Sequence, residues 1–351
     1  MKKWNQVVRP WAKHVALVGL AAAGLNVVIE AAELAPPATT DDKVWLLGEP
    51  PQPADNVATP ARVALGKALF FDPRISGNGT VSCATCHNPS LGWSDGLRTG
   101  VGIDGSRLGR ATPTVINTAY NTQFMWDGRK KSLEDQALGP MKTPEEMKTD
   151  FTAALAMLQG IPGYRAMFEA AYPGESVSEE TLAKAIAAYE RTVVSKNSRF
   201  DQWAAGDRGA ISAQEWRGYK LFTNPAKGNC AACHKPPNFT DNGFHNIGIS
   251  HPAGKEDEGR FKIRPVAVLK GAFKTPTLRD IELTAPYFHN GAAKTLEEVV
   301  DHYARGGDDR SNLSKDMKPL NLSAQDKADI VAFMRTLTSP IQTASLPALP
   351  Q

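Results

Sequence analysis

Apolar residues recur at helical spacing along much of this chain, whereas the strict alternation of a half-buried strand is scarce. Two stretches illustrate the helical pattern. The first contains Leu182, Ala185, Ile186, Tyr189 and Val193, and the second contains Ile330, Phe333, Met334 and Leu337. Both predict amphipathic helices that bury one side. The expected fold class is mainly α, with long irregular loops.

Capping residues predict where several helices begin. The predicted N-caps are Ser132, Ser178, Ser212, Thr295 and Ser323. A further start is predicted at Thr143, because Pro144 would take the first helical position and Glu146 the third. In that position the Glu146 carboxylate would face backbone N–H groups rather than a ligand.

The two ends of the chain lack this pattern. Residues 1–32 resemble an export signal, because Lys2, Lys3, Arg9 and Lys13 precede an apolar run over 15–29 that is short for a membrane span. No clear cleavage site follows, so a retained N-terminal anchor is the alternative. Residues 33–59 are rich in Pro, Ala and Thr and are predicted to be a linker, and residues 341–351 a tail.

The composition excludes few classes of protein function. The 351 residues carry a formal net charge of +3 without a dense Lys/Arg run, so nucleic acid is not an expected partner. A hydrophobic content of 42% is ordinary for a globular protein, and the length allows two domains.

All four cysteines belong to one repeated motif. Cys83-Ala84-Thr85-Cys86-His87 recurs as Cys230-Ala231-Ala232-Cys233-His234. C-x-x-C-H is the attachment sequence of c-type haem, in which the thiols bind the vinyl groups and the imidazole binds iron. A zinc site would need further ligands near each pair, and a thioredoxin-like pair would not need the histidine. We therefore expect two covalently bound haems, with His87 and His234 as iron ligands.

The repetition extends upstream of each motif. Residues 65–73 and 218–225 both read as the end of a helix carrying Phe, followed by a Pro turn and a Gly-containing loop. Two copies separated by so long a period indicate duplicated domains rather than a solenoid. We predict two cytochrome c-like domains with one haem each, at residues 60–205 and 206–340.

The sixth position on each iron decides what such a protein can do. Two strong ligands would make an electron carrier, whereas an open position beside acid–base groups would make an enzyme that activates peroxide or oxygen. The imidazoles left for this role are His14, His245, His251, His289 and His302.

Further motifs accompany the haem sites. They are Leu69-Phe70-Phe71-Asp72-Pro73-Arg74, Thr112-Pro113-Thr114, Phe124-Met125-Trp126-Asp127-Gly128-Arg129, Gly139-Pro140, Lys274-Thr275-Pro276-Thr277-Leu278-Arg279, and residues 283–291. Over roughly residues 55–340 the chain thereby resembles the bacterial dihaem cytochrome c peroxidases, a family that includes MauG. The resemblance implies that peroxide reacts at the N-terminal haem and that the C-terminal haem stores or relays oxidising equivalents.

The resemblance gives roles to three further residues. Gln136 and Glu146 match the distal Gln and Glu of the family, and a carboxylate there can move a proton between the two peroxide oxygens. Trp126 matches a Trp between the haems that relays electrons. Each also has a plainer interpretation, since Glu146 could cap a helix, Gln136 could be an ordinary helix residue, and Trp126 could belong to the core.

Two departures from the family pattern bear on the subtype. Classical peroxidases close the peroxide haem with a loop His, and that position holds Ile103 here, which predicts an open N-terminal haem. They ligate the second haem with Met where this chain has Tyr303, as MauG does. A phenolate lowers the iron potential relative to a thioether. Tyr303 also continues an apolar helix stripe, and His302 and Met317 are rival ligands.

The resemblance also implies a calcium ion held by the carbonyls of Thr284 and Pro286. At the position where the family has an Asn whose side chain binds the calcium, this chain has Ala111, which offers no side-chain oxygen.

Three functions remain open. The preferred one is an exported, periplasmic peroxidase of MauG type that uses hydrogen peroxide to oxidise a protein or other large substrate. The second is reduction of peroxide with electrons from a small cytochrome c or cupredoxin. The third is a non-catalytic dihaem electron carrier. Anchoring through residues 15–29 and a homodimer are further expectations left open.

Overall fold

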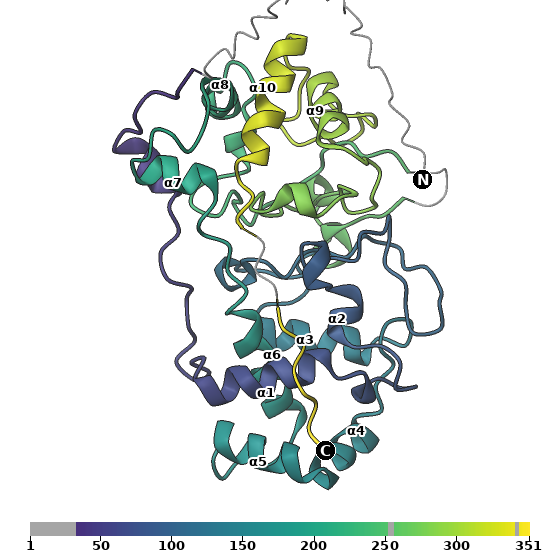
Figure 1. Ribbon diagram of the computed structural model, residues 1–351. Coiled ribbons are helices and arrows are strands. Elements are labelled where there is room, and N and C mark those ends of the chain that lie inside the picture. Colours follow the sequence, from purple (N-terminus) through teal and green to yellow (C-terminus); the bar gives the residue numbers. More distant parts are fainter. Residues whose placement is uncertain (1–32, 252–255, 341–343) are drawn as a thin grey trace, which may run out of the picture. The chain divides into compact units, whose positions relative to one another are not determined.

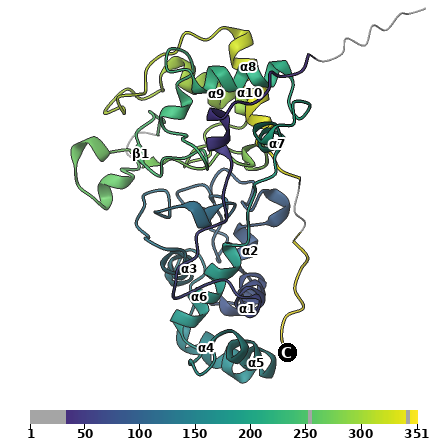
Figure 2. The ribbon, with the colours of Figure 1, turned by 90° about the vertical axis from the view of Figure 1, so that its left-hand side faces the viewer.

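The computed structural model describes residues 33–251, 256–340 and 344–351, and its helices pack around two hydrophobic cores (Figures 1 and 2). The first lobe contains α1 (Pro60–Phe71), α2 (Cys83–Cys86), α3 (Leu133–Lys142), α4 (Phe151–Gly160), α5 (Pro162–Ala171) and α6 (Glu179–Glu190). The second contains α7 (Arg199–Ala205), α8 (Ala213–Thr223), α9 (Leu296–Arg305) and α10 (Ala324–Arg335). The expectation of a mainly α fold is confirmed.

Short elements join these helices. β1 (Phe244–His245) and β2 (Phe273–Lys274) pair antiparallel, with Phe244 opposite Lys274. The 3-10 helices are η1 (Asp41–Trp45), η2 (Pro73–Ile75), η3 (Pro89–Leu91), η4 (Thr118–Tyr120), η5 (Cys230–Ala232), η6 (Arg260–Lys262), η7 (Ala267–Leu269) and η8 (Ile281–Leu283). Within the described ranges, no helix has both the length and the apolar content to cross a membrane. The predicted export signal and anchor lie outside the described residues.

The same close helix crossing occurs in both lobes. A side chain at Gly66 of α1 would place its Cβ 1.9 Å from the carbonyl oxygen of Ala185 in α6. A side chain at Gly218 of α8 would come equally close, at 1.9 Å, to the carbonyl oxygen of Asp329 in α10. Glycine is therefore required at each crossing, and the two glycines occupy corresponding places ahead of the two haem motifs.

Most of the predicted helix starts are confirmed. Ser132, Ser178, Ser212, Thr295 and Ser323 are N-caps, and their side chains accept hydrogen bonds from backbone N–H groups. The start predicted at Thr143 is wrong. Thr143 ends α3, its hydroxyl donates to the Gly139 carbonyl at 2.9 Å, and the next helix begins after Asp150. Glu146 thus lies in a turn and caps no helix.

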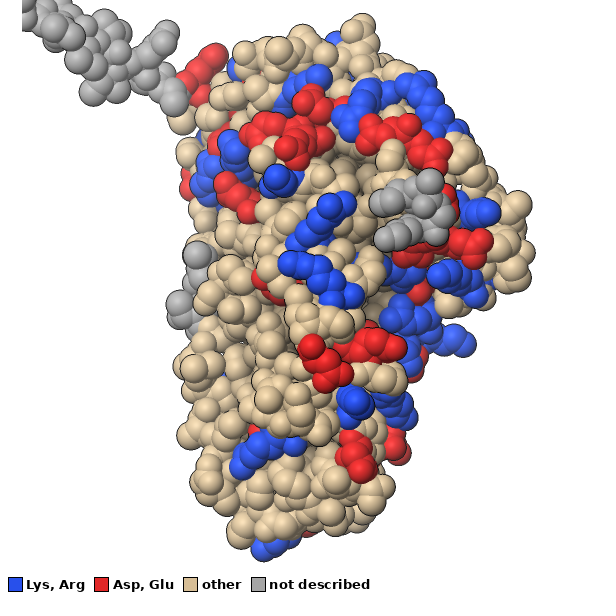
Figure 3. All heavy atoms as spheres, turned by 90° about the vertical axis from the view of Figure 1, so that its right-hand side faces the viewer, with Lys and Arg blue, Asp and Glu red and all other residues tan. Residues whose placement is uncertain are grey.

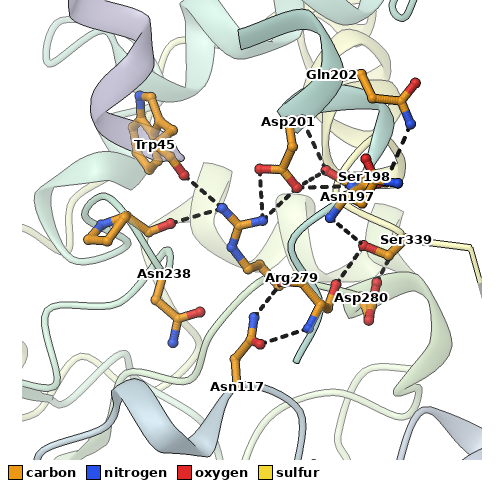
Figure 4. Close-up of polar contacts among 12 residues, drawn as sticks. Trp45, Asn117, Asn197, Ser198, Asp201, Gln202, Asn238, Arg279, Asp280 and Ser339 are labelled. Carbon is orange, nitrogen blue, oxygen red and sulfur yellow. Dashed lines mark hydrogen bonds and ion pairs between the residues drawn. The ribbon is translucent and has the colours of Figure 1, made fainter. Parts of the chain in front are cut away.

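Residues 33–59 pack against the second lobe at their N-terminal end. Trp45 is 4% exposed and stacks on Phe239 with ring centroids 4.3 Å apart. Its carbonyl accepts a 2.7 Å hydrogen bond from buried Arg279, which also binds both carboxylate oxygens of Asp201 (Figure 4). A segment expected to be a linker therefore contributes to a core.

The two lobes contact each other through loops. Asn117 holds Ser195 through hydrogen bonds of 2.9 and 2.8 Å to its backbone, and the Ser195 hydroxyl lies 2.7 Å from that of Ser339, beyond α10. Ser339 N–H in turn donates to Asp280, next to Arg279 (Figure 4). Arg110 binds Asp257 of the second lobe at 2.6 Å. The last residues return to the first lobe, where Gly163 N–H donates to the Gln351 carbonyl at 3.3 Å (Figure 2).

Candidate active site

Both motif histidines are oriented by a backbone carbonyl. His87 Nδ1 lies 3.2 Å from the Trp93 carbonyl oxygen, and His234 Nδ1 lies 2.9 Å from that of Phe239. A carbonyl can only accept, so each Nδ1 carries the proton and each Nε2 keeps its lone pair. Burial lowers the pKa of both imidazoles, that of His234 to about 4, which holds them neutral as iron ligands must be.

One cavity of about 270 Å³ connects the two histidines. Residues of both lobes line it. The lining residues named above as candidate ligands or site residues are His87, Ala111, Trp126, Gln136, Cys230, Cys233, His234, His245, Thr284, Pro286, His289, Tyr303 and Met317. Cys83, Cys86 and Glu146 are not part of this lining. The fold therefore brings most of the predicted site into one space.

The cavity suits a haem at each histidine. The four cysteines are free thiols beside the two imidazoles. The buried Asn121 Oδ1, Glu190 Oε2 and His289 Nε2 atoms line the cavity without a hydrogen-bond partner in the described chain. Buried polar atoms are nearly always paired, so these three indicate polar contacts to a group that fills the space.

Glu146 lies beside the N-terminal haem site. It is partly buried, and its charge contributes to raising the pKa of the Cys86 thiol. Burial raises the pKa of Glu146 as well, against the opposing influence of Arg129. Its carbonyl accepts a 3.0 Å hydrogen bond from the N–H of Ile103. The loop position that carries a His in classical peroxidases therefore adjoins Glu146.

Trp126 is fixed by both lobes. Its indole Nε1 donates to the Ala111 carbonyl at 2.9 Å, and its own carbonyl accepts from Lys274 N–H at 2.8 Å. Arg260 of the second lobe donates to the carbonyls of Asp127 and Gly128 at 2.8 and 2.7 Å. The Trp126 loop is thus held against the second lobe while its side chain lines the shared cavity.

Tyr303 and its neighbour His302 lie in different surroundings. Tyr303 lines the cavity, and burial raises the pKa of its phenol, as do the charges of Cys233 and Cys230. His302 is 2% exposed, and its Nε2 lies 2.8 Å from the Ile247 carbonyl while its Nδ1 lies 3.2 Å from Asp308. Both nitrogens of His302 are therefore engaged, whereas Tyr303 faces the haem cavity.

The residues expected near calcium also line the cavity. Ala111 supplies no side-chain oxygen, and its carbonyl accepts the Trp126 hydrogen bond. The calcium ion at Thr284 and Pro286 stays a prediction.

Glu190 and Lys274 also line the cavity, although the sequence indicated no role for either. Glu190 ends α6, and Lys274 belongs to β2 and to one of the family motifs. Burial lowers the pKa of Lys274 to about 8, and its ammonium donates to the Thr275 carbonyl at 3.0 Å. Neither residue stands out in sequence, because Glu and Lys side chains are usually solvated.

Comparison with known proteins identifies the family of both haem-motif regions. The family profile of di-haem cytochrome c peroxidase matches residues 60–209, and that of cytochrome c matches residues 216–338. The methylamine utilization protein MauG of Methylorubrum extorquens is 48% identical over 86% of this chain and 84% of its own. Cytochrome c551 peroxidase of Nitrosomonas europaea is 37% identical over 88% of this chain and 89% of its own.

Solved structures give the same result. A MauG-like protein associated with microbial copper homeostasis superposes with a TM-score of 0.78 at 32% identity, covering 84% of this chain and 93% of its own. The diheme peroxidase BthA from Burkholderia thailandensis gives 0.71 at 26% identity, covering 84% and 92%. With two cytochrome c-like domains around one shared cavity, this chain belongs to the dihaem cytochrome c peroxidase and MauG family.

Proposed function

We propose that this protein is an exported, periplasmic dihaem peroxidase of MauG type. It reacts with hydrogen peroxide at the N-terminal haem and uses the oxidising equivalents on a protein or other large substrate. The observation that carries this proposal is the contrast between Tyr303, which lines the haem cavity, and His302, whose two nitrogens bind other groups. When bound, the haems would supply a peroxide-binding iron and the storage of two oxidising equivalents.

Glu146 and Gln136 are the proposed acid–base and hydrogen-bonding groups. Reduction of hydrogen peroxide to two waters consumes two protons and two electrons. A carboxyl whose pKa is raised by burial can take a proton from one peroxide oxygen and return it to the departing one near neutral pH. Gln136 lines the haem cavity and has an amide that can orient the peroxide.

Trp126 is the proposed relay between the two sites. Its indole lines the cavity that contains both His87 and His234, and hydrogen bonds from both lobes fix its loop. An indole is more easily oxidised than the aliphatic side chains around it. Electron transfer through Trp126 would let both haems share the oxidising equivalents.

Reduction of peroxide with electrons from a small cytochrome c or cupredoxin is the second candidate. The similarity to cytochrome c551 peroxidase supports it. Tyr303 favours the first candidate, because a phenolate ligand lowers the iron potential and makes the second haem a poorer electron acceptor. Slow turnover with reduced cytochrome c, together with a long-lived two-equivalent oxidised state after peroxide, would exclude the second candidate.

Electron paramagnetic resonance of the resting ferric holoprotein tests the ligand assignment. We expect one high-spin signal from the open N-terminal haem and one low-spin signal from the C-terminal haem. Tyr303→Phe should convert or remove the low-spin signal, whereas the matched control His302→Ala should leave its ligand set unchanged. Two low-spin signals, with the second altered only in His302→Ala or Met317→Leu, would refute the assignment.

A further inference from the structure

Glu190 is a buried acid that no proposed step uses. It is the last residue of α6, is 5% exposed, and lines the haem cavity. Its charge contributes to raising the pKa of the Cys83 thiol, so the carboxyl lies on the N-terminal haem side. Its Oε2 atom is buried and has no hydrogen-bond partner in the described chain.

None of the nearby charged groups pairs with the Glu190 Oε2 atom. Arg191, the next residue, directs Nη2 to Glu134 at 2.7 Å, and its own buried Nη1 is also unpartnered. Glu134 additionally accepts a 2.8 Å hydrogen bond from Asn56. Glu190 therefore lacks the bidentate counter-ion that a buried carboxylate normally requires.

These surroundings favour the neutral acid. Burial raises the pKa of Glu190 to about 8, with Arg191 opposing the shift and Glu134 adding to it. A neutral carboxyl has a proton to donate, and leaving such a donor unpaired in the interior is destabilising because its desolvation is not offset. A residue with a purely structural role would be expected to find its acceptor in the polypeptide. Glu190 instead opens onto the cavity.

We propose that Glu190 is a positioning residue of the N-terminal haem, which donates a hydrogen bond to an acceptor oxygen inside the cavity. That oxygen belongs to a haem propionate or to a water held against the haem. The inference rests on a haem at Cys83 and Cys86 and is independent of the substrate and of Tyr303. Glu190 thereby differs from Glu146, which is proposed to act on peroxide, because it acts on the haem itself.

Reduced-minus-oxidised infrared spectra of the holoprotein test this inference without peroxide. We expect a protonated-carboxyl band that shifts when the N-terminal haem is reduced and that is lost in Glu190→Gln. Glu180→Gln, which removes a 72% exposed carboxylate on the same helix, is the matched control and should keep the band. If a haem propionate is the acceptor, labelling the propionates with carbon-13 will shift the carboxyl band of Glu190. If a water molecule is the acceptor, exchange into oxygen-18 water will shift that band instead.

The haem spectra give a second measurement. Glu190→Leu, which removes the donor, should alter the optical spectrum and reduction potential of the N-terminal haem while leaving those of the C-terminal haem unchanged. Glu190→Gln keeps the shape and a donor, so it should alter the N-terminal haem less, and its infrared spectrum carries the test if Glu190→Leu does not fold. A carboxyl band that persists in Glu190→Gln, or an unaltered N-terminal haem in folded Glu190→Leu, overturns the inference. Loss of peroxide reactivity in Glu146→Gln is measured separately, so failure of the proposed function remains distinguishable.

Discussion

Three histidines of this protein differ in whether they can bind iron, because their ring nitrogens contact different groups. His87 and His234 each give Nδ1 to a backbone carbonyl and keep Nε2 available for iron. His302 lies against a carbonyl through Nε2 and a carboxylate through Nδ1, so neither nitrogen is free to reach an iron. The hydrogen bonds of an imidazole therefore decide whether it can be a ligand.

Ile103→His should close the N-terminal haem. Ile103 N–H binds the Glu146 carbonyl, so an imidazole at this position would lie next to the proposed peroxide site. We expect the high-spin signal of the resting protein to become low-spin and the reaction with peroxide to be abolished until the haem is reduced. Ile103→Gln, which adds a polar group without an imidazole, is the control. A haem that stays high-spin and reactive in Ile103→His would contradict an open site beside this loop.

The helices are held together by a few close contacts that recur in the two lobes. Gly66 and Gly218 permit the α1–α6 and α8–α10 crossings, and each lies just before a haem motif. At the end of α1, the buried Asp72 caps η2. Its carboxylate also accepts 2.7 Å hydrogen bonds from Arg74 and from Tyr164 of α5. Asp72 thus fixes the turn that leads from α1 towards the haem site.

Asp72→Asn should reduce the dependence of stability on acid pH. Burial alone would raise the pKa of Asp72, but the hydrogen bonds from Arg74 and Tyr164 outweigh it and lower the pKa below 3.8. A lowered folded-state pKa gives stability that is present above pH 3.8 and is lost as pH falls through the folded value. Removing the charge should cost about 1–3 kcal/mol at neutral pH.

Urea unfolding at several pH values measures this effect. The free energy of unfolding of Asp72→Asn should fall less than that of the wild type as the solution is acidified towards pH 3. Asp104→Asn, at an exposed carboxyl, should follow the wild type. Parallel acid curves for wild type and Asp72→Asn would show that Asp72 does not supply this stability.

Segments outside the α-helices also pack against the two lobes. Residues near Trp45 complete the second core, and residues 344–351 contact the first lobe. On the face in Figure 3, Lys and Arg side chains are interspersed with Asp and Glu, in keeping with the formal net charge of +3. A partner protein would therefore meet a mixed surface on this face, and its recognition would depend on shape as well as charge.

Trp45→Ala should destabilise the second lobe. Trp45 stacks on Phe239, whose carbonyl orients His234, and its indole donates to Tyr219 at 3.1 Å. Loss of a buried Trp costs about 3–5 kcal/mol, which thermal unfolding followed at the C-terminal haem will detect. Val44→Ala alters a neighbour that is 54% exposed and should have little effect. Equal stability of Trp45→Ala and Val44→Ala would mean that the segment is a free linker.

Several features of the fold could be predicted without the structure. Five N-caps, the helical class and the two haem motifs follow from residues close together in sequence, because capping and C-x-x-C-H attachment involve neighbours in the chain. The helix start at Thr143 was predicted wrongly because that prediction, too, used only neighbouring residues. Its hydroxyl binds the preceding helix at Gly139, and the local pattern does not distinguish that contact from a cap.

Residues of the candidate site could be predicted from the sequence only where they belong to motifs of a known family. The resemblance to a known family selected Trp126, Gln136 and Tyr303, and these line the cavity. Glu190, Lys274 and the engagement of both His302 nitrogens had no signal in the sequence. Burial, unpaired polar atoms and shared cavities arise from residues far apart in the chain, so they are defined only when the two lobes pack together. The order of residues therefore specifies where the haems are attached, and long-range packing specifies which groups surround them.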